Sequence, residues 1–315
     1  MSENKFGFVF PGQGSQKIGM LEESATKYPA IKHTFSEASE AVGYDMWQLV
    51  QEGEQEQINL TETTQPVLLA SSVALWRAWL ESGGSRPSAM AGHSLGEFSA
   101  LVCAGSIEFT DALKLVKQRG AYMQAAVPVG EGAMVAIIGL DDEVINQICA
   151  ETASEFSACV AAVNFNSPGQ VVIAGHAKAV EQAGARCKEA GAKRAMSLPV
   201  SAPFHTDLMK PAGDKLKETI AAIKIKQPDI PVIHNVNASA EIDPDKIKSL
   251  LVEQIYSPVQ WVSCIEKIVK MGAEKLVECG PGKVLSGLSR RIDKSLTSFN
   301  IEAPEDLAEA VESLK

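Results

Sequence analysis

The sequence predicts an α/β protein in which a large domain is interrupted by a small α+β domain. Short apolar segments alternate with helical segments near both ends of the chain, whereas the order of elements changes between residues 130 and 200. The length of 315 residues also fits two domains, because one domain commonly takes roughly 150 residues. We therefore expect a discontinuous large α/β domain, residues 1–129 and 201–315, and a small domain, residues 130–200.

The first part of the chain is expected to alternate strands with helices. The predicted elements are a buried strand at 6–10, helical segments to about residue 52, a helix at 64–81, a strand at 88–92, and helices at 97–104 and 110–125. Gly83 and Gly84 end the helix that precedes them, since glycine favours helix termination. Thr110 is expected to cap the last of these helices with its hydroxyl group.

The segment from 130 to 200 has the order β-α-β-β-α-β. Its predicted elements are strands at 132–140, 159–163, 170–174 and 193–198, and helices at 141–149 and 177–190. An Asn-Ser-Pro-Gly turn at 166–169 joins the two central strands. Because this order is the ferredoxin-like arrangement, we expect a small ferredoxin-like α+β subdomain inserted into the large domain.

The α/β alternation resumes after residue 200. The predicted elements are strands at 231–235, 275–279 and 299–302, and helices at 244–254, 259–271, 284–292 and 304–314. Pro304 lies near the start of the last helix, a position that proline favours. Strands that alternate with helices favour a parallel sheet, which we expect in the large domain.

Composition and charge exclude several classes of protein. Hydrophobic residues make up 45% of the chain and charged residues 22%, which is typical of a globular protein rather than a disordered one. The formal net charge of −10 disfavours nucleic acid and anionic membranes as partners. The apolar segment 67–80 is too short and too polar to span a bilayer, and the apolar stretch before Pro11 is too short for a secretory signal peptide.

The six cysteines are widely spaced, and no two of them form a C-x-x-C pair. They therefore suggest neither a zinc site nor a redox pair. We expect them to be small core residues of a protein in the reducing cytoplasm, and we predict no metal site.

The segment Gly92-His-Ser-Leu-Gly96 is the strongest local signal in the chain. A predicted strand precedes it and a predicted helix follows, which is the context of the nucleophile elbow in α/β-hydrolase-like sheets. The glycines would leave room around a cramped turn, and the hydroxyl of Ser94 would project beside the backbone N–H groups that begin the helix. The alternative is a glycine-rich turn in which the serine only caps the helix.

A serine nucleophile needs a base, and the candidates are five histidines. His205 lies in the loop Ser201–Thr206 that leaves the small domain, and loops at domain junctions commonly carry catalytic groups. The other four are His33, His93, His176 and His234. These we interpret as solvated or structural, although His205 could also be an ordinary histidine near a helix start.

Two further segments could serve the same site. The glycine turn at 10–16 follows the first strand and lacks the spacing of a phosphate loop, so we expect it to present a backbone N–H group at the sheet edge. Arg119 lies within the predicted helix at 110–125 and could either be solvated or face a cleft and hold a carboxylate. The glycine-rich segment 280–283 is interpreted as a structural turn.

Seven motifs, in order along nearly the whole chain, resemble the malonyl-CoA:acyl carrier protein transacylases of type II fatty acid synthesis. They are FVFPGQGSQ (8–16), AGHSLGEFSALVCAG (91–105), QRG (118–120), NFNSPGQVVIAG (164–175), APFHT (202–206), PVQW (258–261) and ECGPGKVL (278–285). The resemblance implies an acyltransferase with a serine nucleophile.

The resemblance also implies the catalytic residues. Ser94 would be the acylated nucleophile, and His205 would be its general base. Gln254 would orient His205 through its main-chain carbonyl group, in place of the acidic member of a triad. The backbone N–H groups of Gln13 and Leu95 would form the oxyanion hole.

Substrate-binding residues follow from the same resemblance. Arg119 would pair with the free carboxylate of the malonyl group. Leu95 and Phe204 match the malonyl-preferring pattern of the family. Asn164 and Asn166 would lie near the cleft, with no role that the sequence assigns.

The implied reaction moves the malonyl group from malonyl-CoA to the phosphopantetheine thiol of acyl carrier protein through a malonyl-serine intermediate, and it needs no cofactor. The implied protein is a cytoplasmic monomer whose partners are malonyl-CoA and acyl carrier protein, with neither nucleic acid nor membrane among them. Two alternatives remain at the sequence level: a serine esterase or thioesterase with the same nucleophile, and a non-catalytic scaffold. A scaffold would be expected to lose Ser94, His205 or Arg119, and all three are present.

Overall fold

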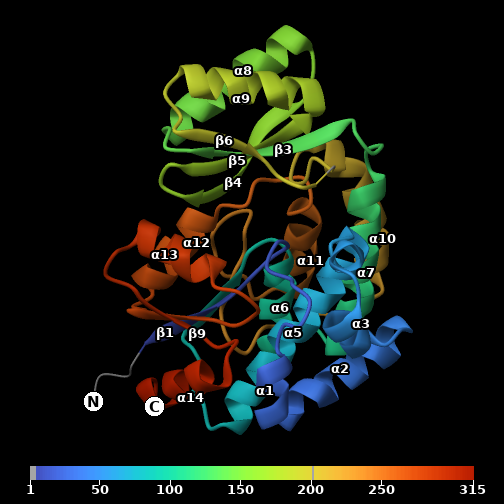
Figure 1. Cartoon of the computed structure of the whole chain (residues 1–315), viewed down its shortest axis with the longest axis vertical. Helices are drawn as coiled ribbons and strands as arrows, with labels where there is room; N and C mark the ends of the chain where they lie inside the picture. Colours follow the sequence, from blue (N-terminus) through green and yellow to red (C-terminus); the bar gives the residue numbers. More distant parts are fainter. Residues whose placement is uncertain (1–4, 201) are drawn as a thin grey trace.

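Two separate β-sheets organise the chain (Figure 1). The computed structural model describes residues 5–200 and 202–315. Residues 1–4 and Ser201, which belong to the predicted large domain, lie outside the described residues. Within the described ranges, no helix is long and apolar enough to cross a membrane.

The larger sheet has five parallel strands in the order β7-β2-β1-β8-β9. Its strands are β1 (Phe6–Phe10), β2 (Ala89–Gly92), β7 (Val232–Ile233), β8 (Lys275–Glu278) and β9 (Thr297–Asn300). Strand β1 is central, and its last residue pairs with the last residue of β2. The prediction of a parallel sheet is therefore confirmed. Because β1 and β2 end side by side, the loops that follow them begin at the same edge of the sheet.

Helices surround this sheet (Figure 1). They are α1 (Glu22–Lys27), α2 (Pro29–Val42), α3 (Met46–Glu52), α4 (Gln55–Ile58), α5 (Thr61–Glu81), α6 (Leu95–Cys103), α7 (Phe109–Ala125), α10 (Lys210–Ala221), α11 (Pro244–Glu253), α12 (Trp261–Lys270), α13 (Val284–Ile292) and α14 (Pro304–Ser313). Helix α5 is buried along most of its length because it packs on the sheet through aromatic rings. The ring of Phe8 in β1 lies 5.2 Å from those of Trp76 and Trp79, in edge-on contacts that favour tight packing.

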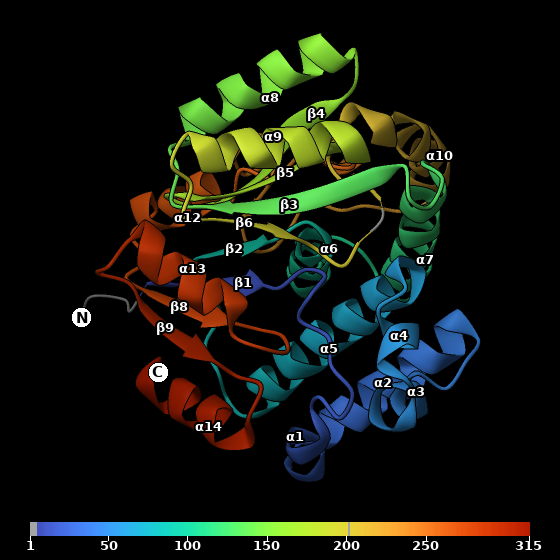
Figure 2. The ribbon, with the colours of Figure 1, turned by 45° about the horizontal axis from the view of Figure 1, so that its top comes forward.

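The smaller sheet is antiparallel and has the order β4-β5-β3-β6. Its elements are β3 (Gly132–Ile138), α8 (Asp142–Phe156), β4 (Val160–Ser167), β5 (Gln170–His176), α9 (Ala177–Glu189) and β6 (Arg194–Ser197). Figure 2 shows α8 and α9 together on the outer face of this sheet, while its other face is turned towards the large sheet. The ferredoxin-like prediction is confirmed, whereas the division of the chain at residues 130 and 200 stays a prediction.

Several predicted elements differ from the observed ones. Thr110 does not cap α7, because the helix begins at Phe109 and Glu108 is its N-cap. Helix α8 continues to Phe156, seven residues beyond the predicted end, because apolar residues on its inner side keep packing on the small sheet. Strand β4 also runs longer than predicted, to Ser167, and bends at two register shifts. All six cysteines are free, as expected.

The two sheets meet along strand β4. The N–H group of Val259 donates to the carbonyl of Val163 at 2.8 Å, and the N–H group of Phe165 donates back to Val259 at 3.1 Å. These bonds tie β4 to the segment that leads into α12. The ends of β1 and β2 therefore face residues of the small sheet across a cleft, where the candidate site lies.

Candidate active site

Ser94 stands on a strained turn between β2 and α6. Its φ and ψ angles are 51° and −106°, a conformation that side-chain-bearing residues rarely adopt. The flanking glycines are required by close contacts: a Cβ at Gly92 would lie 1.8 Å from the carbonyl carbon of Gly96, and a Cβ at Gly96 would lie 2.1 Å from the carbonyl oxygen of Phe10. The turn has the geometry of a nucleophile elbow.

Asn235 holds this turn from the side. Its Oδ1 accepts the N–H group of Ser94 at 2.7 Å, and its Nδ2 donates to the carbonyl of Gly92 at 2.7 Å. The N–H groups of Gly96 and Glu97 are bonded within the turn. Among the described residues, the N–H group of Leu95 has no acceptor, and it stands at the N-terminus of α6, where the helix dipole favours negative charge.

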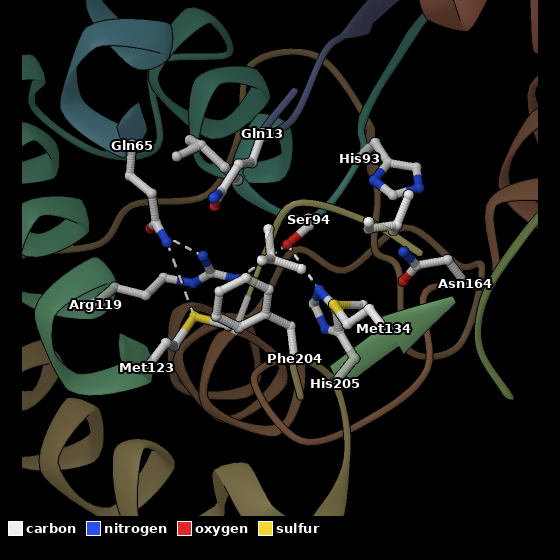
Figure 3. A pocket seen from close by; sticks show the side chains of 13 residues that line it. Gln13, Gln65, His93, Ser94, Arg119, Met123, Met134, Asn164, Phe204 and His205 are labelled. Carbon is white, nitrogen blue, oxygen red and sulfur yellow. Dashed lines mark hydrogen bonds between the residues drawn. The ribbon is translucent and has the colours of Figure 1, made fainter. Parts of the chain in front are cut away.

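The glycine turn after β1 brings Gln13 to the same place. A Cβ at Gly12 would lie 2.5 Å from the carbonyl oxygen of His93, so the turn lies directly against the elbow. Gln13 lines the pocket above Ser94 (Figure 3), and its side chain donates to Thr61 at 3.4 Å. Its backbone N–H group has no acceptor within the described part of the chain. The two N–H groups expected to form an oxyanion hole are thus both free.

His205 connects the nucleophile to a backbone carbonyl. Its Nε2 lies 2.9 Å from Ser94 Oγ, and its Nδ1 lies 2.8 Å from the carbonyl oxygen of Gln254. A carbonyl only accepts, so Nδ1 carries the proton and Nε2 is free to accept the serine hydroxyl. The residue is held at a φ of 64°, and its N–H group donates to the carbonyl of Ile255. The expected contact between His205 and the main chain of Gln254 is present.

The imidazole of His205 is almost fully buried. Burial, together with the positive charge of Arg119, lowers its pKa from 6.5 to about 3. The ring is therefore neutral at physiological pH, which is the state that a general base requires.

Arg119 is buried in the wall of the pocket, so the interpretation of it as a solvated side chain is wrong. Its Nη1 donates to Gln65 Oε1 at 2.9 Å, and its Nη2 donates to Gln254 Oε1 at 2.8 Å and to Ser94 Oγ at 3.2 Å. The neighbouring Gly120 allows α7 to lie close enough to α5 for Arg119 to reach Gln65. A Cβ at Gly120 would lie 2.5 Å from the carbonyl oxygen of Thr61 and would push α7 away from α5. Burial lowers the pKa of Arg119 to about 10, so the guanidinium stays charged at neutral pH.

Apolar and polar side chains close the pocket, whose cavity measures about 110 Å³. Phe204 and Met123 lie beside Arg119, whereas Met134 and Asn164 reach in from the small sheet (Figure 3). The Oδ1 atom of Asn164 is buried without a hydrogen-bond partner. The Nε atom of Arg119 is also buried without a partner, so this small cavity is suited to a short ligand with a negative charge.

His93 and Asn166 form a second polar pair at the rim of the site. The Nε2 atom of His93 lies 2.8 Å from Asn166 Oδ1, and the imidazole makes no hydrogen bond to Ser94. The side chains of these two neighbouring residues therefore serve different contacts. Asn164 and Asn166 both lie near the cleft, on β4.

Three buried polar residues of the site had no role assigned from the sequence. Gln65 lies near the start of α5, Glu97 three residues after the nucleophile, and Asn235 after the short strand β7. Their side chains bond to groups distant in the sequence, which no periodicity records. The adjacent His234 is buried against Glu97, in agreement with its structural interpretation.

The described residues contain no group of three or more His, Cys, Asp or Glu side chains placed to hold a metal ion. The site contains a serine hydroxyl, a neutral imidazole and two backbone N–H groups without acceptors among the described residues. These can attack a carbonyl carbon, take up the proton and stabilise the oxyanion.

Comparisons with known proteins agree with this geometry. Residues 7–301 match the acyl transferase domain family. The chain is 56% identical to the malonyl CoA-acyl carrier protein transacylase of Escherichia coli strain K12, over 98% of this chain and 99% of that protein. It is similar to the crystal structure of an acyl carrier protein S-malonyltransferase from Vibrio cholerae, with a TM-score of 0.95 and 56% identity over 99% and 100% of the two chains. It is also similar to a malonyl-transacylase in complex with a type II PKS acyl-carrier protein, with a TM-score of 0.96 and 52% identity over 98% and 99%.

Substituting Gly92 by Ala is expected to lower the free energy of unfolding by about 3 kcal/mol or more, because backbone atoms of the elbow would have to move. Gly287→Ala is the matched control: this glycine lies exposed in α13, and a Cβ there meets nothing within 4 Å, so a gain of about 0.5 kcal/mol is expected. Urea unfolding of both variants measures the difference. If Gly92→Ala were as stable as the unaltered protein, the elbow would tolerate a side chain at this position.

The imidazole of His205 is expected to stay neutral between about pH 8 and about pH 5, since its pKa is lowered to about 3. Because this pKa is lower in the folded state, the unfolded chain takes up the proton more readily, and this histidine reduces stability as the pH falls below about 6.5. Histidine proton resonances, assigned with a His205→Gln variant, test the first statement. A His205 resonance that titrates with a midpoint near 6.5 would contradict it.

Proposed function

Because the chain belongs to the acyl transferase domain family and matches its malonyl CoA-acyl carrier protein transacylases over nearly its whole length, we propose that Ser94 is the residue that carries the acyl group. The activity is transfer of the malonyl group from malonyl-CoA to acyl carrier protein, which supplies extender units for fatty acid synthesis. Acyl carrier protein is the partner that accepts the group. We further propose that the protein acts in the cytoplasm, as a monomer, without a metal or redox cofactor.

The observation that carries the assignment is the distance from the guanidinium of Arg119 to the hydroxyl of Ser94, 3.2 Å. In a malonyl thioester, one methylene separates the carboxylate carbon from the carbonyl carbon, which places them about 2.5 Å apart. A carboxylate bound by Arg119 therefore brings the thioester carbonyl to the nucleophile. A longer dicarboxylic group would have to fold back in a small cavity.

Acylation begins with malonyl-CoA in this position. The oxygen of Ser94 attacks the thioester carbon while its proton passes to Nε2 of His205. The N–H groups of Gln13 and Leu95 stabilise the oxyanion, and removal of one such donor typically raises a barrier by about 3 kcal/mol. The carbon–sulfur bond then breaks, and the coenzyme A thiolate takes the proton from His205.

The second half-reaction reverses the first. The phosphopantetheine thiol of the carrier protein loses its proton to His205, its sulfur attacks the malonyl ester, and Ser94 Oγ leaves and recovers the proton. This is a ping-pong transfer, in which the two thiols use the same base in turn. Gln254 keeps the imidazole in the tautomer that both steps need, through the bond from Nδ1 to its carbonyl group.

Phe204 and Asn164 are proposed to bind the substrate. Phe204 borders the side of the pocket where Arg119 lies, and Asn164 lines the opposite wall. An uncharged acyl group such as acetyl has no carboxylate, so the buried guanidinium of Arg119 would gain no negative partner. A site built around one polar group rejects ligands that lack the complement.

Intact-protein mass spectrometry after mixing with malonyl-CoA is the test of this function. The unaltered protein is expected to gain one malonyl group, to keep it in buffer, and to lose it when holo acyl carrier protein is added. Ser94→Ala is expected to gain none, because the hydroxyl that bonds to His205 is removed. Rapid release of free malonate in buffer would instead support a hydrolase, and absence of any adduct on the unaltered protein would support a scaffold.

Replacing Arg119 by Ala is expected to lower kcat/KM for malonyl-CoA about 100-fold and to leave acetyl-CoA transfer within about threefold of its original rate. Only the malonyl group has a carboxylate that pairs with Arg119, so only malonyl transfer loses this ion pair. Arg77→Ala is the matched control. Arg77 forms an ion pair with Glu37, with a nitrogen–oxygen distance of 2.7 Å, and this pair does not belong to the site. Steady-state rates with both thioesters measure the preference. If the unaltered enzyme used malonyl and acetyl equally, this role of Arg119 would be wrong.

A further inference from the structure

Glu97 is a completely buried carboxylate that the mechanism above does not use. It lies on the first turn of α6, three residues after the nucleophile. Its Oε1 accepts a hydrogen bond from His234 Nδ1 at 2.7 Å. Its Oε2 accepts from the N–H group of Asn235 at 2.9 Å and from Gln254 Nε2 at 2.8 Å.

Two of these partners each hold a different part of the active site. Asn235 clamps the elbow through the N–H group of Ser94. Gln254 holds His205 by its main chain and Arg119 by its side chain. A single carboxylate therefore touches both residues that position the nucleophile, the base and the cation.

The contact with Glu97 fixes the orientation of the Gln254 amide. The nitrogen Nε2 donates to the Glu97 carboxylate and to the carbonyl of Ser94, two groups that can only accept. The oxygen Oε1 must therefore point the other way, where it accepts from Arg119 Nη2. If the amide were reversed, its nitrogen would face the guanidinium and both acceptors would face an oxygen.

Charge adds to this geometry. Among the described residues, no carboxylate forms an ion pair with Arg119, whose partners are two amide oxygens and a hydroxyl. A buried cation without a counter-charge is costly. The negative charge of Glu97, one amide away, counteracts the effect of burial on the guanidinium.

We propose that Glu97 is a positioning residue for malonyl selectivity: through the Gln254 amide it aims the guanidinium of Arg119 at the carboxylate of the substrate. This rests on the proposed function, since it assigns Arg119 to the malonyl carboxylate. Glu97 touches neither the substrate nor the reacting atoms. Its loss should therefore change which acyl group is preferred rather than abolish the chemistry.

Glu97→Gln is the first test, because it keeps the shape of the side chain. Its amide oxygen can still accept from Asn235 and Gln254, and its nitrogen can donate to His234 once that ring changes tautomer. A neutral acceptor replaces a charged one, so the ratio of malonyl to acetyl transfer is expected to fall about fivefold, through the malonyl rate alone. The rates of acyl-Ser94 formation from both thioesters, followed by mass spectrometry, give this ratio.

Glu278→Gln is the matched control. Glu278 is also completely buried, and it accepts the backbone N–H groups of Leu285 and Ser286, but it makes no contact with the site. We expect its substitution to change stability and to leave the malonyl-to-acetyl ratio unaltered. If removing any buried carboxylate affected selectivity, the malonyl-to-acetyl ratio would fall in both Glu97→Gln and Glu278→Gln.

Gln254→Met provides a second, independent variant. It keeps the carbonyl that holds His205 and removes the amide that joins Glu97 to Arg119, so the ratio should fall about tenfold. The double variant should be no less selective than Gln254→Met alone, because the link is already broken.

A folded Glu97→Gln protein whose ratio stays within about twofold of the original overturns the proposal, as does an equal fall in both rates. If Glu97→Gln does not fold, an unchanged ratio in Gln254→Met overturns it. Failure of the proposed function is recognised separately, since the unaltered protein would then form no malonyl adduct or would release it in buffer as free malonate.

Discussion

The buried guanidinium of Arg119 is the constraint around which the active site is built. A cation removed from water has to be surrounded by acceptors, and the chain supplies Gln65, Gln254 and the hydroxyl of Ser94. Each acceptor comes from a different helix or turn, so the demand of one charge links α5, α6, α7 and the end of α11. Burial, and after it the same charge, lowers the pKa of His205 and so keeps the imidazole neutral.

Close backbone contacts place these groups with little freedom. The elbow can reach its position only because Gly92, Gly96 and Gly12 carry no side chain, and the absence of a side chain at Gly120 lets α7 approach the start of α5 closely. The parallel pairing of β1 with β2 then delivers the oxyanion turn and the nucleophile to one edge of the sheet. In the proposed mechanism, backbone N–H groups left free by this arrangement, rather than side chains, meet the developing negative charge, and they need no reorganisation when the reaction occurs.

The sequence was sufficient where local pattern decides structure. Alternation of strands and helices predicted the parallel sheet, and the order of elements after Gly132 predicted the ferredoxin-like unit. Tertiary packing decided the rest: apolar contacts with the small sheet extend α8 to Phe156, and Thr110 is displaced from the N-cap by the helix starting at Phe109. In the site, the motif residues were recognisable, but the role of Glu97 within its motif was not, because its partners lie more than 130 residues away in the chain.

In the proposed mechanism, charge coupling between Arg119 and His205 adds a kinetic component to selectivity. The positive charge of the guanidinium is one of the causes that lower the pKa of the base, so the imidazolium formed during acylation is disfavoured while that charge is uncompensated. A malonyl carboxylate bound to Arg119 cancels the charge and, by Coulomb's law in a poorly screened site, makes His205 a stronger base. An acetyl group brings no such compensation. The group that identifies the substrate therefore also activates the base, and discrimination acts on the rate of the chemical step as well as on binding.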